Sequence, residues 1–440
     1  MVTQKVGTEM EKDQYGNVNV LLLGYGGAEH DGGYLTDSII VASRNPDIGN
    51  VSMFSIPRDL RVKSPVTKGY GRINAIFTQF MGRNKKDAHI SASGTKAEVE
   101  MILGMQIPYY ATIDFTAFKE VINTVWGIDI IVPETIHDTS YPNEENRGYI
   151  TFHIDAWSQH LDGDTALKYA RSRHSTSDFS RSLRQQIIIM GIKDKMLNAG
   201  IDLKMVPDLY DQYKTYVTTN ISLQEMLRAA QYAKTTNQFS SFGFTTNCSF
   251  QNFIKMPPAC FLYYPDRAVF DGASVMLPMG ASASTPQNYT SMQTFTEFLI
   301  ARPAFVYQKA TIEVLNGIEK SLARSKGMGS TAFAGQLAVK LKRYGFNIMS
   351  TENAETPLSE SYITINMVGD YTATIEAIQI FLPITDIRYN TGNVQTGRDD
   401  NGKEFFYTDG PEISLYLGAD YLLGSETLSG LVQNKFTYDK

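Results

Sequence analysis

The chain has 440 residues, 42% of them hydrophobic and 20% charged, which is typical of a globular protein with a buried core. A chain of this length is expected to form two or three domains rather than one. The formal net charge of -6 excludes a global electrostatic attraction to nucleic acid, so any anion must be bound by local clusters of basic residues. No apolar run reaches the length of about 18 residues that a transmembrane helix needs.

The first residues, MVTQKVGTEMEKDQYG (1–16), are polar and predict a disordered lead. They leave open whether the protein is soluble throughout or whether a membrane anchor has been removed before residue 1. The two cysteines, Cys248 and Cys260, have no nearby histidine and make a poor metal site. A disulfide in an exported protein and two reduced buried thiols both stay open as interpretations.

Strands and helices alternate along the following part of the chain. Apolar runs predict strands around residues 18–27, 36–45, 50–60, 109–114 and 128–133. Helical periodicity and capping residues predict helices around residues 96–105, 114–127, 161–174, 179–197 and 221–233. This alternation predicts an α/β fold, an α/β/α sandwich with a central mixed sheet.

A change of composition near ARPAFVYQ (301–308) marks a predicted domain boundary. Beyond it, strands around 310–317, 361–368 and 412–420, helices around 330–345 and 371–382, and a turn-rich hairpin loop at 390–405 predict a smaller C-terminal α/β domain. The predicted organisation is a lead at 1–16, a first domain at 17–302, a second domain at 308–425 and a tail at 426–440.

Arginines and acids gather at the ends of the predicted elements of the first domain. These residues and one neighbouring glutamine are Arg58, Asp59, Arg171, Arg173, Asp178, Arg181, Arg184 and Gln185. Helical spacing predicts that Arg181, Arg184 and Gln185 share one face of their helix with Asp178. On the opposite side, Leu183, Ile187 and Met190 are expected to face the core.

Several guanidinium groups repel one another unless an anion lies between them, and the planar fork of arginine suits bidentate phosphate binding. Asp37 and Asp59 add oxygen ligands for a hard cation such as Mg2+. The pattern therefore predicts a metal-assisted pyrophosphate site suited to phosphoryl transfer. The competing interpretation is a set of solvated surface pairs, each worth under about 1 kcal/mol.

Six segments occur in the order and approximate spacing of the LytR-CpsA-Psr catalytic domain, and residues 17–300 resemble that family. The segments are TDSIIVAS, SIPRDL, GRINAIF, DFTAFKEVINTVWGIDI, LDGDTALKYARSRH and DFSRSLRQQ. Residues 308–425, with IEVLNG and AGQLAVKLKRYGFNI, resemble the LytR C-terminal domain. That second domain carries no comparable cluster of charged residues, so an accessory and a purely structural role both stay open.

The resemblance implies a phosphotransferase that moves a glycan phosphate from a polyprenyl-pyrophosphate carrier to a peptidoglycan hydroxyl, with Mg2+ or Mn2+ as cofactor. By this resemblance Asp37 matches the metal-binding acid and Asp178 an acid that orients arginines. The residues that match its pyrophosphate-binding positions are Arg58, Arg171, Arg173, Arg181 and Gln185, with Arg72 as a further basic residue near the phosphate. Asp59 is a candidate general base, or it holds an arginine in place.

Two positions depart from the family. In the loop LGYGGAEHDGG (23–33), Tyr25 stands at the place we match to an aspartate of a G-x-D pattern that serves as a second metal ligand, and Leu35 stands where the family has an arginine. Glu29, His30 and Asp31 lie in the same loop. We hypothesise that Asp31 or His30 replaces the missing ligand, since carboxylates and imidazole both bind divalent metals.

The carrier's isoprenoid tail requires an apolar tunnel, for which helix residues 115–125 and 187–192 are candidates, although such stripes also form ordinary core. The alternative functions are a polyprenyl-pyrophosphate hydrolase and a non-catalytic protein that binds lipid-linked glycan. The resemblance also implies a location on the extracytoplasmic face of the cell membrane, with a single N-terminal anchor. The expected partners are the lipid-linked glycan, peptidoglycan and, through that anchor, the membrane.

Overall fold

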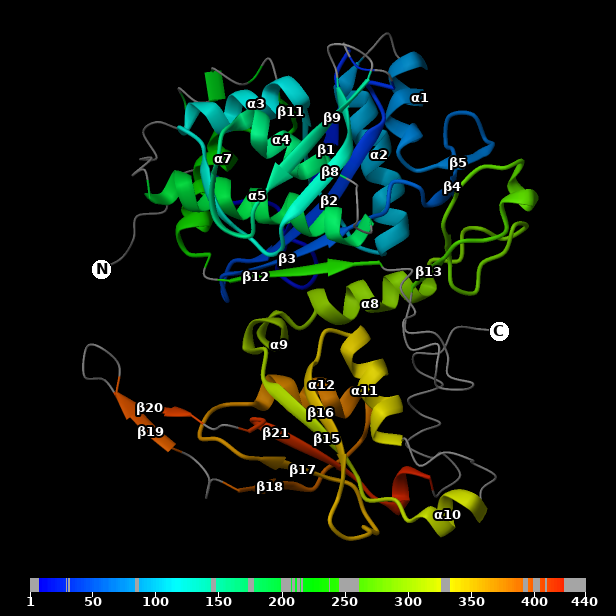
Figure 1. Cartoon of the computed structure of the whole chain (residues 1–440), viewed down its shortest axis with the longest axis vertical. Coiled ribbons are helices and arrows are strands. Elements are labelled where there is room, and N and C mark those ends of the chain that lie inside the picture. The colour runs from blue at the N-terminus through cyan, green and yellow to red at the C-terminus, as the bar shows by residue number, and fades with distance from the viewer. Residues whose placement is uncertain are drawn as a thin grey trace. The chain divides into compact units, whose positions relative to one another are not determined.

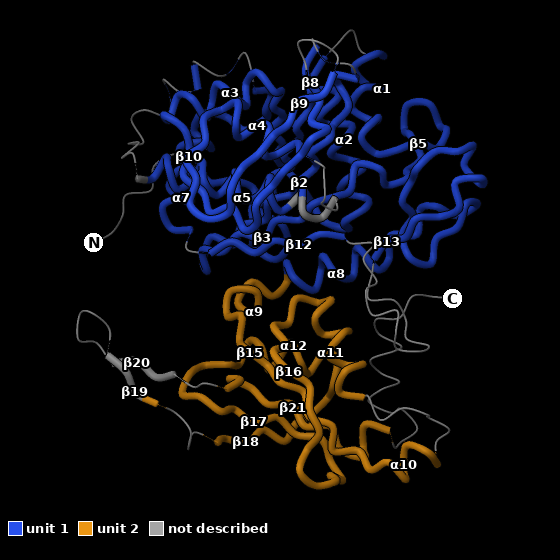
Figure 2. The backbone as a smooth tube through the Cα atoms, viewed as in Figure 1, with its two compact units in different colours: residues 1–246, 261–300 blue, residues 247–260, 301–440 orange. Residues whose placement is uncertain are grey.

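The protein divides into two compact units, shown in different colours in Figure 2; the first takes residues 1–246 and 261–300 and the second takes the rest. The structure is a computed structural model. It describes residues 8–28, 30, 32–83, 87–143, 148–172, 178–198, 207, 210–211, 214, 217–236, 238–244, 261–325, 333–390, 395–398, 404–407 and 410–422.

A six-stranded mixed sheet forms the centre of the first unit (Figure 1). In spatial order its strands are β11 (Val217–Thr219), β6 (Tyr109–Asp114), β1 (Val18–Tyr25), β2 (Thr36–Asn45), β3 (Asn50–Ser55) and β12 (Gln238–Gly243). β1 pairs antiparallel with β2 and parallel with β6, while β3 pairs antiparallel with β2 and parallel with β12. This mixed sheet confirms the predicted fold class.

The helices of this unit are α1 (Ala75–Arg83), α2 (Ala88–Leu103), α3 (Phe115–Thr124), α4 (Gly163–Arg171), α5 (Asp178–Asn198), α7 (Leu223–Lys234) and α8 (Thr290–Ile300). They cover both faces of the sheet, because alternate side chains of each strand point to opposite faces. On one face Tyr25 stacks on Phe77 of α1, with ring centroids 5.2 Å apart. On the other face Ile40 and Met53 pack with Ile189 of α5.

Smaller strand pairs surround this core. The antiparallel hairpin of β8 (Ile136–Asn143) and β9 (Gly148–Ile154) and the ribbon of β7 (Ile128–Val132) and β10 (Trp157–Leu161) pack with α3, α4 and α5 in one apolar cluster. The remaining elements are β4 (Arg61–Lys63), β5 (Tyr70–Arg72), β13 (Leu262–Tyr263), β14 (Leu277–Pro278) and the 3-10 helix η2 (Arg267–Phe270). No helix in the described ranges is long and apolar enough to cross a membrane.

The lead at residues 1–16 differs from its prediction over the part that the structure describes. Met10 is only 3% exposed and packs against Val18 and Tyr109. The Asp13 carboxylate accepts hydrogen bonds from the Asn17 backbone N–H at 2.9 Å and from the Asn19 amide at 2.8 Å. The expectation of disorder is therefore wrong for residues 8–16, whose burial depends on tertiary contacts.

The second unit contains a five-stranded sheet in the order β16-β15-β21-β17-β18. Its strands are β15 (Thr311–Asn316), β16 (Asn347–Asn353), β17 (Tyr362–Ile365), β18 (Ile387–Tyr389) and β21 (Ile413–Leu417), with a separate hairpin of β19 (Gln395–Arg398) and β20 (Glu404–Tyr407). Its helices are α9 (Pro303–Gln308), α10 (Lys320–Ser325), α11 (Phe333–Arg343), α12 (Thr372–Phe381) and the 3-10 helix η3 (Ala419–Tyr421). The similarity of this unit to the LytR C-terminal domain stays a prediction.

Candidate functional site

A cavity of about 820 Å³ lies in the first unit, between the α5-facing side of the central sheet and helices α3, α4 and α5. Leu22 and Ile40 contribute its floor from the sheet, while Phe118, Ile188 and Ile192 contribute helical walls. Both stretches predicted as candidate tunnel walls supply side chains to this lining: residues 115–125 through Phe115 and Phe118, and residues 187–192 through Ile188, Ile189 and Ile192. The interior is therefore large and mostly apolar, as ligand-binding cavities are.

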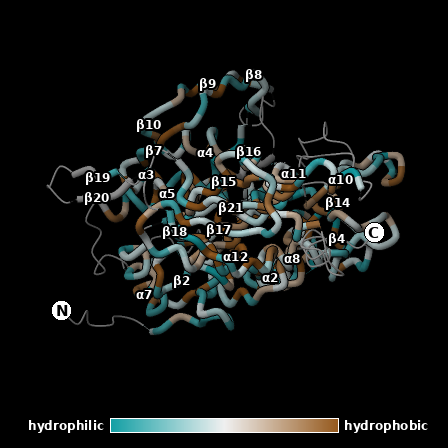
Figure 3. The backbone as a smooth tube through the Cα atoms, turned by 90° about the horizontal axis from the view of Figure 1, so that it is seen from below, coloured by the Kyte–Doolittle hydropathy of each residue, from teal (hydrophilic) through white to brown (hydrophobic). Residues whose placement is uncertain are grey.

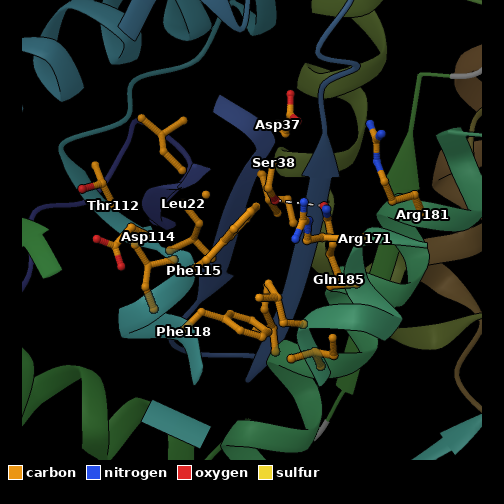
Figure 4. Close-up of a pocket in the computed structure, with 18 of the residues that line it drawn as sticks. Leu22, Asp37, Ser38, Thr112, Asp114, Phe115, Phe118, Arg171, Arg181 and Gln185 are labelled. Carbon is orange, nitrogen blue, oxygen red and sulfur yellow. Dashed lines mark hydrogen bonds between the residues drawn. The ribbon is translucent and has the colours of Figure 1, made fainter. Parts of the chain in front are cut away.

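Polar side chains from three separate elements also reach the cavity. Asp37 and Ser38 open β2, Arg171 ends α4, and Arg181 and Gln185 lie one turn apart on α5. Figure 4 shows these five side chains on one side of the cavity, facing Leu22, Phe115 and Phe118. The Ser38 hydroxyl donates a hydrogen bond of 2.9 Å to the Gln185 side-chain carbonyl, which links the start of β2 to α5.

Arg171 is held in place by aromatic rings. Its guanidinium lies 4.3 Å from the ring centroid of Phe115 and donates a hydrogen bond of 3.3 Å to the Tyr141 hydroxyl. The planar fork of arginine suits planar and tetrahedral anions, and stacking on an aromatic face fixes the plane of the guanidinium. At the other end of α4, Asp162 caps the helix by accepting from the Thr165 N–H at 2.7 Å.

Arg58 joins the cavity through Asp37. Its Nη1 lies 2.9 Å from Asp37 Oδ1, and the Asn74 amide donates to the same oxygen at 3.3 Å. On its other side, Arg58 Nε lies 3.6 Å from Asp59, which also pairs with Arg72 at 3.1 Å. Asp59 is thus bracketed by two arginines and is not among the lining residues, an arrangement that favours the arginine-holding role over that of a general base.

Arg184 is not among the residues that line the cavity with Arg181 and Gln185, so the structure gives no support to its predicted role in substrate binding. It is 4% exposed, and its guanidinium donates to the backbone carbonyls of Tyr169, at 3.0 Å, and Ser172. The helical spacing between positions 181 and 184 rotates the side chain by about 300° around the helix axis, that is about 60° away from Arg181. That rotation is enough to direct Arg184 to the end of α4.

Two acids that sequence reasoning did not single out also line the cavity. Asp114 caps α3, accepting from the Ala117 N–H at 2.8 Å, and a cap signal before FTAF could have identified it. Asp138 is 3% exposed and accepts from the Ser172 hydroxyl at 2.7 Å, which ties the β8–β9 hairpin to the segment after Arg171. No local sequence signal predicts that long-range pair.

Of the two metal ligands proposed in the loop at residues 23–33, the structure describes His30. The His30 ring lies edge-on to Phe115, 5.0 Å between ring centroids, beside the cavity lining. Tyr25 ends β1 and is buried. In a G-x-D pattern that starts at Gly24, the aspartate position is Gly26 and not Tyr25, to which the sequence analysis assigned it. Among the described residues, no group of three or more His, Cys, Asp or Glu side chains lies close enough to hold a metal.

Four other predicted residues lie outside what the structure describes: Asp31, Arg173, Cys248 and Cys260. For Asp178, the structure describes only the backbone, as the first residue of α5. The described part of the predicted set therefore comes together as one cavity group, Asp37, Arg171, Arg181 and Gln185, backed by the ion-paired chain Arg58, Asp59 and Arg72.

Comparison with known proteins gives one consistent family. A sequence model of the LytR_cpsA_psr family matches residues 2–255. The chain is 34% identical over 200 residues to a polyisoprenyl-teichoic acid–peptidoglycan teichoic acid transferase, TagV of Bacillus subtilis, covering 44% of this chain and 47% of TagV. It is 27% identical over 229 residues to TagU of Bacillus anthracis, a protein with the same transferase name, covering 50% of this chain and 65% of TagU.

The crystal structure of Bacillus subtilis TagV aligns with 64% of this chain and 97% of its own, at 26% identity and a TM-score of 0.47. The sequence alignments span about half of TagV and just under two thirds of TagU.

Proposed function

Because the chain belongs to the LytR_cpsA_psr family, we propose that it is a phosphotransferase that moves a glycan phosphate from a polyprenyl-pyrophosphate carrier to a hydroxyl of peptidoglycan. The relatives TagV and TagU are named for transfer of teichoic acid from a polyisoprenyl carrier to peptidoglycan, which supports this class of donor and acceptor. Such a reaction takes place outside the cytoplasm, on the outer face of the cell membrane.

The observation that carries the proposal is the joining of two environments in one cavity. Apolar side chains such as Leu22, Phe118 and Ile188 suit an isoprenoid chain, while Arg171 and Arg181 suit a pyrophosphate. A lipid pyrophosphate is the kind of ligand that requires both in adjacent positions. A soluble nucleotide would leave the apolar part of the cavity unfilled.

In the proposed step, an acceptor hydroxyl oxygen attacks the phosphorus bonded to the glycan. The new P–O bond forms as the bond to polyprenyl phosphate breaks, so the carrier leaves as its monophosphate and the hydroxyl proton passes to a base or to solvent. Arg171 and Arg181 stabilise the charge that develops on the leaving phosphate. Arg58 positions Asp37 at the cavity edge through the 2.9 Å ion pair.

We further propose Mg2+ or Mn2+ as the cofactor, with Asp37 as its protein ligand. Mg2+ is commonly held by one or two carboxylates together with substrate phosphates and water, and it therefore needs no complete protein cage. Asp37 lines the cavity and its side chain is 41% exposed, which fits such a ligand. The bound ion would neutralise pyrophosphate charge, and His30 and Asp31 are the candidates for a second ligand.

The test is incubation of the protein with a short-sugar polyprenyl pyrophosphate, a peptidoglycan oligomer and Mg2+, followed by mass spectrometry of both substrates. Glycan phosphate on the oligomer together with polyprenyl monophosphate supports the transferase. Sugar phosphate released without modification of the oligomer indicates a hydrolase that uses the same cavity. Retention of the lipid with no product indicates a binding protein, and either of these results overturns the proposal.

A further inference from the structure

The only two tryptophans of the chain, Trp126 and Trp157, are both on the surface of the first unit. Trp126 is 78% exposed and Trp157 is 79% exposed, although tryptophan is usually largely buried. Both flank the β7–β10 ribbon: Trp126 lies two positions before the start of β7, and Trp157 opens β10, opposite Val132 at the far end of β7. In Figure 3, β10 lies at the outer margin of this unit with β8 and β9.

Trp126 occupies a backbone position that favours glycine. The Gly127 N–H donates to the Ile122 carbonyl and the Trp126 N–H to the Asn123 carbonyl, both at 2.9 Å. This is the Schellman pattern at the end of α3, in which the residue at the position of Trp126 is left-handed and most often glycine. Trp126 has φ 57°, in the left-handed region, and is followed by Gly127 with φ 80°.

Trp157 repeats this combination with φ 80° and an exposed ring. A left-handed conformation costs a residue with a side chain about 1–2 kcal/mol relative to its preferred regions, and exposing an indole ring loses the benefit of burying it. Packing does not explain why one ribbon contains two tryptophans that each combine a left-handed backbone with an exposed ring. Residues in such conformations often mark functional sites.

The exposed side chains of the ribbon between positions 126 and 157 include one apolar and several polar groups. Ile131 is 61% exposed and pairs across the ribbon with Ser158. Asp129 and His160 pair in the same way, with His160 Nδ1 2.6 Å from the Asp129 carboxylate. That hydrogen bond holds the pKa of Asp129 below its ordinary value, so the carboxylate remains an acceptor in neutral solution.

The charge of this surface restricts its partners. Residues 126–134 and 155–162 contain Asp129, Glu134, Asp155 and Asp162, and no lysine or arginine. Lys195 of α5 reaches this surface, with its ammonium 3.4 Å from the Asp129 carboxylate, so its charge is paired there and the ribbon stays net acidic. Anionic lipid surfaces and polyphosphate chains are bound by clusters of basic residues, so this surface disfavours both. Sugar rings present apolar C–H faces to aromatic rings and hydroxyl groups to carboxylate, imidazole and hydroxyl side chains, which are the groups found here.

We propose that the β7–β10 ribbon, with Trp126 and Trp157 at its two ends, is a binding surface for an uncharged glycan chain. The four residue steps from Ile128 to Val132 separate the two ends by roughly 13 Å, enough for a short run of sugar rings along the ribbon. The surface is formed by residues that do not line the cavity. Glycan binding here does not depend on the transfer reaction, because it requires neither the donor lipid nor a metal.

The presence of only two tryptophans gives the experiment its reporter, since all indole emission of the chain comes from this surface. We would titrate the full chain with a soluble oligomer of N-acetylglucosamine and follow tryptophan fluorescence, with calorimetry as a second measurement. We expect a saturable change in emission. Trp126→Gly and Trp157→Gly should each weaken binding about tenfold or more, as loss of a central aromatic contact does.

Tyr389→Ala is the matched control, because Tyr389 is 76% exposed on β18 of the second unit and should leave binding unchanged. The glycine variants should unfold at the same or a higher temperature than the parent, since glycine relieves the left-handed strain. Absence of binding to the oligomer would overturn the proposal. So would binding to vesicles containing phosphatidylglycerol in its place, because that result would identify a membrane contact.

Discussion

Replacement of Arg171 is the sharpest test of the cavity as a pyrophosphate site. Arg171→Ala removes a guanidinium that Phe115 holds at 4.3 Å and that reaches the cavity. Hydrogen bonds to a charged group contribute about 1.5–3 kcal/mol, which predicts a loss of kcat/KM of roughly 10- to 150-fold. Arg171→Lys should fall between the parent and the alanine variant, because it keeps the charge and loses the planar fork.

The assay is initial-rate transfer from a polyprenyl pyrophosphate donor to a peptidoglycan oligomer, with donor binding measured separately. Arg324→Ala, an exposed position on α10, serves as the matched arginine control and should retain parental rates. Thermal unfolding of each variant separates loss of function from loss of fold. Parental kcat/KM in Arg171→Ala would refute the assignment of this side chain to the pyrophosphate.

Ile188→Trp should fill the apolar part of the cavity and weaken the binding of a long-chain polyprenyl donor more than that of a short-chain donor, as measured by competition binding. Equal weakening of both would contradict the assignment of the isoprenoid chain to this part of the cavity. Arg184→Ala leaves the Tyr169 and Ser172 carbonyls without this buried donor. Its free energy of unfolding in urea should fall by about 2–3 kcal/mol, and unchanged stability would contradict the structural role. Burial raises the pKa of Glu98 from 4.5 to about 7, so the unfolded chain loses this proton at lower pH than the folded chain. The free energy of unfolding should therefore fall as pH rises from 4.5 to about 7. Glu98→Gln should reduce this dependence of the free energy of unfolding on pH, and an unchanged dependence would argue against Glu98 as its source.

The sequence predicted strands β1, β2, β3 and β6 of the central sheet, because strand patterns are local properties of the chain. The grouping of Asp37 with Arg171, Arg181 and Gln185 came from the family resemblance, since these residues lie far apart along the chain. The sequence did not predict that Arg184 points to the end of α4 instead of into the cavity, because its orientation depends on the carbonyls of Tyr169 and Ser172. Helical spacing alone places residues three and four apart on neighbouring parts of a surface and does not say where the edge of a cavity falls.

The β8–β9 hairpin was also missed, although it contributes Asp138 and supports Arg171 through Tyr141. Its first strand, IHDTSYPN, has few apolar residues and a register shift between Asp138 and Tyr141, which removes the strict alternation that identifies a strand. The burial of Met10 was likewise not predicted, because it results from contact with Val18 and Tyr109. Both features arise from tertiary packing and leave no periodic pattern in the sequence.

The central claim is tested most directly by following phosphorus from donor to acceptor. A polyprenyl pyrophosphate carrying a short glycan, labelled at the phosphate next to the sugar, is incubated with the protein, Mg2+ and a peptidoglycan oligomer. The account predicts label on the oligomer, equimolar release of unlabelled polyprenyl monophosphate, and loss of both in Arg171→Ala. Label that appears only in free sugar phosphate, or remains in the donor, would contradict it.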